Sequence, residues 1–223
     1  METEGIVLKR KILSEKLLHL TVFTLKLGKI NILYKPSLKN FPLSTEPFSV
    51  SLFKLEIFEE KIEAESIKLI RHHFPENLNR LKYLSLLSFY IDKATLAPNR
   101  KVYQLANFYL EIKEKYLLAA TMFIVKLSYF EGIFPVLKRC VSCGSNKVSA
   151  FSIEKGGTVC KGCKKPDDII WDERLSYQVE LLLKKPFKTT PVKDAGKLKK
   201  IKTVFENHLF YRVEDGKVIR RQS

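Results

Sequence analysis

Alternating apolar and polar positions dominate the first seventy or so residues of the chain. Between residues 29 and 35, Ile30, Ile32 and Tyr34 alternate with polar residues, and this period of two predicts a strand with one buried and one solvated face. Similar segments predict strands at residues 4–10, 19–28, 47–58 and 60–70, although the last of these also suits a helix. Five short strands with a long loop after Lys35 predict a small closed barrel, of which the oligonucleotide-binding (OB) barrel is one form.

The hydrophobic period becomes helical after residues 72–77. Leu81, Leu84, Leu87 and Ile91 recur at spacings of three and four, which predicts a helix over residues 78–96 with Asn77 as its N-cap. Further helices are predicted at residues 101–116, from 117 through the apolar stretch that follows, and at 175–185 and 197–213. The predicted fold class is α+β: an N-terminal five-stranded OB-type β-barrel (residues 1–76), followed by an all-helical domain (77–223) with an inserted four-cysteine motif (140–163).

The most apolar stretch, residues 116–134, contains Lys126 and Glu131. These charges leave no clean run of about 20 apolar residues, so the stretch is interpreted as a buried helix. The N-terminus carries early acids and no sustained apolar core of a signal peptide. We therefore expect a soluble cytoplasmic protein with no membrane partner. In a reducing compartment, paired CxxC motifs favour a metal over disulfides.

The four cysteines of the chain form two CxxC motifs separated by sixteen residues: Cys140, Cys143, Cys160 and Cys163. Four thiolates suit tetrahedral Zn²⁺ and leave no open position for a substrate. The motif therefore predicts one structural zinc ion and no catalytic metal. A redox pair of CxxC motifs and plain buried thiols are the alternatives, and the absence of any cysteine outside the motif favours the metal.

The charge balance points to a polyanionic ligand. The chain has 40 Lys and Arg against 24 Asp and Glu, a net charge of +16, and nucleic acid is the usual partner of such a surplus. The net charge is +2 in residues 1–76, +6 in 77–139 and +8 in 140–223. The helical part is thus as relevant to binding as the barrel. The alternative is a basic surface from an organism that favours Lys and Glu.

Basic residues close to predicted strand ends, the long loop and the helix ends are candidates for phosphate contacts, with neighbouring aromatic rings for base stacking. These candidates are Lys9, Arg10, Lys11, Lys29, Lys35, Lys39, Lys93, Arg100 and Lys101. An ordinary solvated lysine face is the alternative for each. No GxxxxGK[ST], HExxH or GxSxG motif occurs, and the four histidines share no ligand spacing. No catalytic residue and no enzyme activity are therefore expected.

Short motifs in a fixed order resemble the RecO family of bacterial DNA repair and recombination mediators. They are Glu4-Gly5-Ile6-Val7-Leu8, Ser14-Glu15-Lys16, Thr24, Gly28-Lys29, Gly132 through Pro135, Cys140-Val-Ser-Cys143-Gly144, Phe151-Ser152, Gly156-Gly157 and Cys160-Lys-Gly-Cys163. The loop Pro36-Ser37-Leu38-Lys39 and residues 215–221 depart from the usual pattern of the family.

The resemblance implies an activity and a set of partners. Such proteins bind single- and double-stranded DNA, anneal complementary strands, and engage the acidic C-terminal tail of single-strand-binding protein. With RecR they help to load the RecA recombinase, so RecA is an indirect partner. The resemblance also implies a cytoplasmic, nucleoid-associated location. From the residues alone, a zinc-stapled RNA-binding protein of translation or ribosome assembly remains an alternative, and so does a nuclease.

Overall fold

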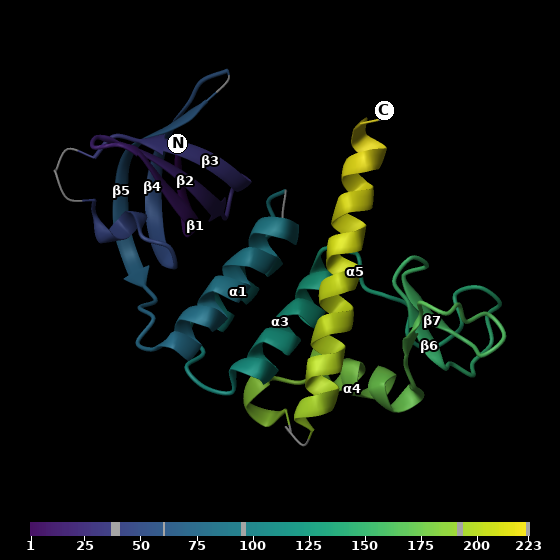
Figure 1. Ribbon diagram of the computed structural model, residues 1–223. Coiled ribbons are helices and arrows are strands. Elements are labelled where there is room, and N and C mark those ends of the chain that lie inside the picture. The colour runs from purple at the N-terminus through teal and green to yellow at the C-terminus, as the bar shows by residue number, and fades with distance from the viewer. Residues whose placement is uncertain (37–40, 60, 95–96, 191–193, 222–223) are drawn as a thin grey trace. The chain divides into compact units, whose positions relative to one another are not determined.

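The computed structural model describes residues 1–36, 41–59, 61–94, 97–190 and 194–221, with side chains described through Val213. The chain forms two compact units, Met1–Glu114 and Lys115–Ser223 (Figure 1). The first two helices belong to the same compact unit as the barrel. The domain division after residue 76 stays a prediction.

Five strands close the barrel in the order β1-β2-β3-β5-β4. They are β1 (Glu2–Ser14), β2 (Leu17–Thr24), β3 (Gly28–Tyr34), β4 (Ser49–Ile57) and β5 (Ile62–His72), and a 3₁₀ turn at Leu43–Thr45 precedes β4. Neighbouring strands are antiparallel except β3 and β5, which run parallel and pair at Leu33–Glu63 and Tyr34–Ala64. The predicted five-stranded barrel is confirmed, and residues 62–72 form a strand rather than a helix.

The barrel core is built from alternate residues of the strands. Its buried members are Val7, Leu18, Leu20, Val22, Ile32, Phe53, Leu55 and Ala64. The residues between them point to the outer face, where Phe23 contacts the ring of Tyr103 at a centroid distance of 5.9 Å. Strand β1 continues to Ser14, beyond the predicted end at residue 10, because residues 11–14 still pair with β2.

Two helices complete the first unit. Helix α1 (Leu78–Ala94) begins after Asn77, whose Oδ1 accepts a hydrogen bond from the Arg80 N–H at 2.9 Å; the predicted N-cap is confirmed. Helix α2 (Arg100–Leu110) begins after Asn99, which accepts hydrogen bonds from the N–H groups of two residues in its first turn. It ends at Leu110, six residues before the predicted end.

The second unit contains the remaining helices. They are α3 (Tyr116–Phe130), α4 (Glu173–Lys184) and α5 (Ala195–Arg221), with a 3₁₀ turn at Phe187–Thr189. Helices α3 and α5 lie side by side (Figure 1). The half-buried Lys126 of α3 donates to the carbonyl oxygen of Leu183 at 2.5 Å, at the end of α4. This contact explains how a lysine fits into an apolar helix.

Between α3 and α4 the chain forms a small cysteine-bearing insertion. Its sheet has the order β7-β6-β8, from β6 (Ala150–Ser152), β7 (Gly157–Val159) and β8 (Ile169–Ile170). The predicted α+β class, with a barrel followed by a helical region carrying an inserted cysteine cluster, is confirmed. The sequence pattern did not predict the three short strands. Among the described helices, none is both long and apolar enough to cross a membrane.

Candidate metal centre and nucleic-acid interface

Two tight turns hold the four cysteines. The Gly144 N–H donates to the carbonyl oxygen of Cys140 at 2.9 Å, and the Cys163 N–H donates to that of Cys160 at 3.1 Å. Gly144 has a φ of +77° with open space around it, a conformation that glycine adopts without strain. Each CxxC motif therefore forms a tight hydrogen-bonded turn, and the two turns present their thiols toward a common point.

The four sulfur atoms all lie within 4.8 Å of one another. The Sγ atoms of Cys143 and Cys160 are 3.7 Å apart, far beyond a disulfide bond of about 2.05 Å. Four sulfurs at about 2.3 Å from one Zn²⁺ in a tetrahedron would lie about 3.8 Å from each other. The donor type, number and spacing therefore fit a four-coordinate dication, and this is the one such cluster of His, Cys, Asp or Glu found within the described residues.

The protein alone favours ionisation of only part of this cluster. Burial opposes the ionisation of Cys140, but backbone N–H groups of Cys160, Ser142 and Cys143 lower its pKa to about 6. Proton sharing with the sulfurs of Cys160, Cys143 and Cys140 raises the pKa of Cys163 to about 12. Four thiolates thus need a cation among them, since a metal ion supplies the positive charge that deprotonates its ligands.

The small sheet positions the first cysteine turn. Cys140 is buried with Ala150 and Val159 in a small core that Val141 and the second CxxC motif partly cover. The Val141 N–H donates to the carbonyl oxygen of Thr158 at 2.9 Å, which ties the turn to β7. The cluster is therefore anchored to hydrogen-bonded backbone rather than to loose loops.

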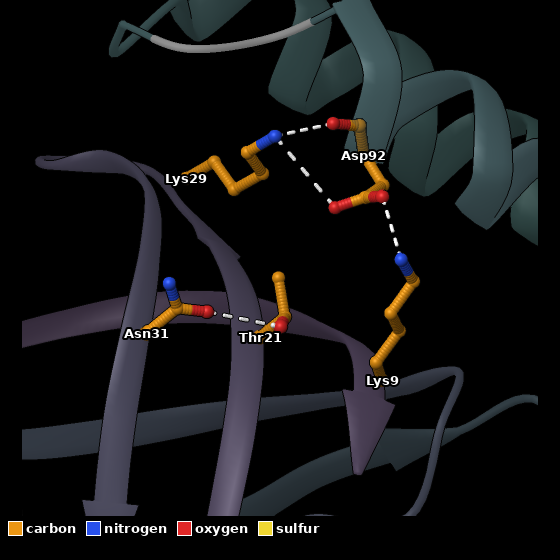
Figure 2. A network of polar contacts seen from close by, with 5 residues as sticks. All are labelled: Lys9, Thr21, Lys29, Asn31 and Asp92. Atoms are coloured by element: carbon orange, nitrogen blue, oxygen red, sulfur yellow. Dashed lines mark hydrogen bonds and ion pairs between the residues drawn. The ribbon is translucent and has the colours of Figure 1, made fainter. Parts of the chain in front are cut away.

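Two of the candidate DNA-binding lysines meet at one aspartate of α1. Figure 2 shows Lys9 of β1 and Lys29 of β3 pointing toward Asp92, beside the hydrogen-bonded pair Thr21 and Asn31 on the outer barrel face. The Lys9 Nζ lies 2.7 Å from one Asp92 oxygen, and the Lys29 Nζ lies 3.6 Å from the other and also donates to the Asp92 main-chain carbonyl. Burial would raise the pKa of Asp92, but the two ammonium groups outweigh it and lower that pKa. Asp92 therefore stays ionised and partly neutralises both lysines.

The run Lys9, Arg10 and Lys11 is divided between two faces of the barrel. Lys9 and Lys11 lie opposite Thr21 and His19, whereas Arg10 lies opposite the core residue Leu20. The Arg10 guanidinium pairs with Glu46 at 2.7 Å and lies 5.7 Å from the ring centroid of Phe41. Sequence neighbours thus do not share one surface here.

The remaining candidates lie at strand and helix ends. Lys35 is exposed just after β3, and Lys39 lies outside the described residues. The Lys93 Nζ lies 5.8 Å from the ring centroid of Phe89, while Arg100 and Lys101 are exposed in the first turn of α2. The connection between α1 and α2 packs against Gly28, next to Lys29. The structure thus gathers Lys9, Lys29 and Lys93 around the end of α1.

The second unit has a cavity of about 680 Å³ that the sequence did not reveal. Apolar side chains such as Phe134, Leu137 and Leu183 line it, together with the cations Lys138, Arg139 and Lys184. Glu180 pairs with Lys184 at 2.6 Å and lies 3.6 Å from Lys138. Because the lining comes from two separate segments of the chain, within residues 134–148 and 173–184, no single stretch of sequence carries its signal.

Comparisons with known proteins identify the family. The family model described as "Recombination protein O C terminal" matches residues 75–217, more than half of the chain and including all four cysteines. DNA repair protein RecO of Alkaliphilus metalliredigens (strain QYMF) is 29% identical over 216 residues, which cover 91% of this chain and 85% of that protein. DNA repair protein RecO of Oceanobacillus iheyensis is 28% identical over 190 residues, covering 78% of this chain and 72% of that protein. The chain therefore belongs to the RecO family.

Proposed function

We propose that the protein is a DNA repair and recombination mediator that catalyses no covalent step. It binds single- and double-stranded DNA, anneals complementary strands and helps to load recombinase onto DNA coated with single-strand-binding protein. Membership of the RecO family is the observation that carries this proposal. The charge supports it, because residues 1–114 carry a net charge of +5 and residues 115–223 carry +11.

Strand annealing follows from electrostatics alone. Two complementary strands repel each other through their phosphates, and lysines that bind both backbones release condensed counterions and reduce that repulsion. No bond is made or broken, so no catalytic group is required. The exposed Lys11, Lys35, Arg100 and Lys101 are proposed contacts. Lys9, Arg10, Lys29 and Lys93 are also proposed contacts, and at each of them a phosphate would compete with an acidic or aromatic neighbour.

The test is a salt titration of binding to a labelled single-stranded oligonucleotide, followed by fluorescence anisotropy. Affinity is expected to fall steeply and log-linearly with salt, and annealing of complementary strands should accelerate at low salt. Matching RNA serves as competitor: a clear preference for RNA would replace this proposal with an RNA-binding function. Labelled DNA incubated with Mg²⁺ or Mn²⁺ should stay intact, and cleavage that follows the purified protein would contradict the non-enzymatic proposal.

We also propose that Cys140, Cys143, Cys160 and Cys163 hold one structural Zn²⁺. The sulfur spacing supports this, and the ion, when bound, stabilises four thiolates and locks the two turns together. Elemental analysis should find one zinc per chain. Cys160→Ser should lower both the zinc content and the unfolding free energy, with Ser142→Ala as a control that leaves both near wild-type. Full zinc retention in the cysteine variant would contradict the ligand assignment.

The proposed partners are RecR, the acidic C-terminal tail of single-strand-binding protein and, indirectly, RecA. The cavity of the second unit supports the acidic-tail partner, since it combines an apolar lining with three cations and two acids, a surplus of one positive charge. A fluorescent acidic tail peptide should bind the protein and lose affinity in Lys138→Ala, whereas Lys155→Ala, outside the cavity lining, should bind it normally. Because its proposed ligand is chromosomal DNA, the protein is expected on the nucleoid in the cytoplasm.

A further inference from the structure

A second cavity, of about 440 Å³, lies in the first unit where β5 ends and α1 begins. Its charged and polar lining includes Arg71, His73, Glu76, Arg80, Glu111 and Lys113. None of these residues belongs to the candidate DNA contacts or to the cysteine cluster. The cavity therefore needs an explanation of its own.

Arg80 is the central group of this cavity. Its side chain is almost fully buried, since the residue is 1% exposed. The Nη2 atom donates to the carbonyl oxygen of Leu110 at 2.5 Å, but Nε and Nη1 have no hydrogen-bond partner among the described residues. The ring of Tyr83 lies beside the guanidinium, with its centroid 5.9 Å away. A buried cation with two unused donors is costly unless an anion accompanies it.

His73 adds a third polar atom without a partner. The residue is 6% exposed, and its Nε2 has no hydrogen-bond partner within the part of the chain that the structure describes. Burial, and then the charges of Arg71 and Arg80, lower the pKa of His73 to about 4. The ring is therefore neutral at physiological pH and can donate one hydrogen bond from Nε2 without adding charge.

The carboxylates of the cavity are already committed to other cations. Glu111 forms an ion pair with Arg71, and Glu76 forms one with Lys113 at 3.1 Å. The guanidinium of Arg80 is thus the one cation of the lining that no described carboxylate pairs with. His72 also lines the cavity, and burial lowers its pKa as well. With both histidines neutral, the lining carries one surplus positive charge, which matches a ligand of at least one negative charge.

We propose that this cavity binds a phosphate group through Arg80 and His73. Each edge of a guanidinium joins Nη2 with either Nε or Nη1 and presents two parallel N–H groups that match two oxygens of a phosphate. Leu110 accepts from only one of the two Nη2 hydrogens, so one edge remains for the ligand, and Nε2 of His73 is available for a third oxygen. The start of α1 adds the partial positive charge of a helix N-terminus. Three donors favour a tetrahedral oxyanion over a carboxylate. The proposal is independent of the proposed DNA-mediator function.

Calorimetric titration of the full-length protein with inorganic phosphate, in chloride buffer of low ionic strength, tests the site. Saturable 1:1 binding is expected, at least tenfold weaker in Arg80→Lys, which keeps the charge but loses the planar pair of donors. His73→Phe, which removes the ring nitrogens, should weaken it similarly and keeps the test valid if the arginine variant does not fold. Lys82→Ala, at an exposed lysine of α1 that does not line the cavity, is the control and should bind within twofold of wild-type.

Two further arms identify the ligand. Acetate should compete poorly; competition equal to that of phosphate would overturn the choice of phosphate. Oligonucleotides with a 5′-phosphate or a 5′-hydroxyl distinguish a DNA strand end from free phosphate as the ligand. Tighter binding of the phosphorylated strand, with the difference lost in Arg80→Lys, assigns the site to strand ends. Equal binding of the two strands assigns the site to free phosphate. No saturable phosphate binding by the folded wild-type protein, or a crystal structure in which Arg80 pairs with Glu76 or Glu111, would overturn the proposal.

Discussion

Gly28 meets two separate requirements at the start of β3. Its φ is +70°, a region that side chains with a Cβ rarely adopt. A Cβ added there would also lie 2.5 Å from the Ala97 carbonyl carbon and 2.6 Å from the Pro98 nitrogen. Gly132 has nearly the same φ, +73°, but nothing within 4 Å of an added Cβ. The two glycines therefore separate backbone strain from steric crowding.

Gly28→Ala is expected to destabilise the protein more than Gly132→Ala. Backbone strain alone should cost about 1–2 kcal/mol in each variant, and crowding against rigid backbone should add about 1–3 kcal/mol at Gly28 only. Urea unfolding measures both differences. Equal losses in the two variants would show that the helix connection does not pack against Gly28.

His73 predicts a loss of stability in acid. Its pKa is about 4 in the folded protein against 6.5 for the free side chain, so the unfolded chain binds the proton first as the pH falls. The stabilisation is present above pH 6.5 and disappears as the pH falls toward 4. At about 1.4 kcal/mol per pKa unit, the loss reaches up to about 3 kcal/mol. Urea unfolding in phosphate-free buffer at pH 7.5 and 4.5 should show a smaller loss in His73→Gln; an equal loss would contradict the assignment.

The roles and orientations of single residues differ in how well they can be predicted from the sequence. The cysteine quartet is predictable, because chelation requires a set spacing that is visible in the chain. The orientation of Arg10 is not, because a register irregularity between Val7 and Lys9 changes which residues face inward. A one-residue shift moves every following side chain to the other face. The buried Arg80 was also missed, since its position in the first turn of a helix gives no sign of a cavity.

At the scale of elements, Asp92 joins α1 to strands β1 and β3 through Lys9 and Lys29. Asp92→Asn should release both lysines, and if they contact DNA, affinity for a single-stranded oligonucleotide should rise about two- to fivefold, the range of a weak ion pair. Glu65→Gln is the control, because Glu65 pairs with Lys54, which is not a candidate contact. Equal changes in the two variants would remove Lys9 and Lys29 from the interface.

The long elements were predictable and the short ones were not. The α1 helix and the first four strands of the barrel were predicted without an alternative, whereas the fifth strand was predicted from a segment that also suits a helix; all six exist. Strands β6, β7 and β8 have only three, three and two residues, too few to display a period. The end of α2 was misplaced because residues 111–115, Glu-Ile-Lys-Glu-Lys, are all compatible with a helix, whereas the structure ends the helix before Lys115, which has a φ of +52°.

At the scale of the whole molecule, metal removal should act first on the second unit. The single tryptophan, Trp171, is buried beside the cysteine insertion, where its main-chain N–H donates to Ser149 and its ring lies 5.5 Å from Phe151. A chelator should therefore shift its fluorescence to longer wavelength, and added Zn²⁺ should restore it. Cys160→Ser should show the shifted spectrum without chelator. An unchanged spectrum after complete zinc removal would contradict a structural role for the metal.

The barrel is closed unevenly around its circumference. Strands β4 and β5 are joined by nine residue pairs, whereas the parallel β3–β5 junction has only two. Because β5 is also the last strand of the barrel to leave the ribosome, the side of β3 at Leu33 and Tyr34 that pairs with β5 remains an open edge until about thirty further residues have been synthesised. During translation this edge is where a nascent chain can pair with a neighbour, so the interval before closure is when the protein is most prone to aggregate.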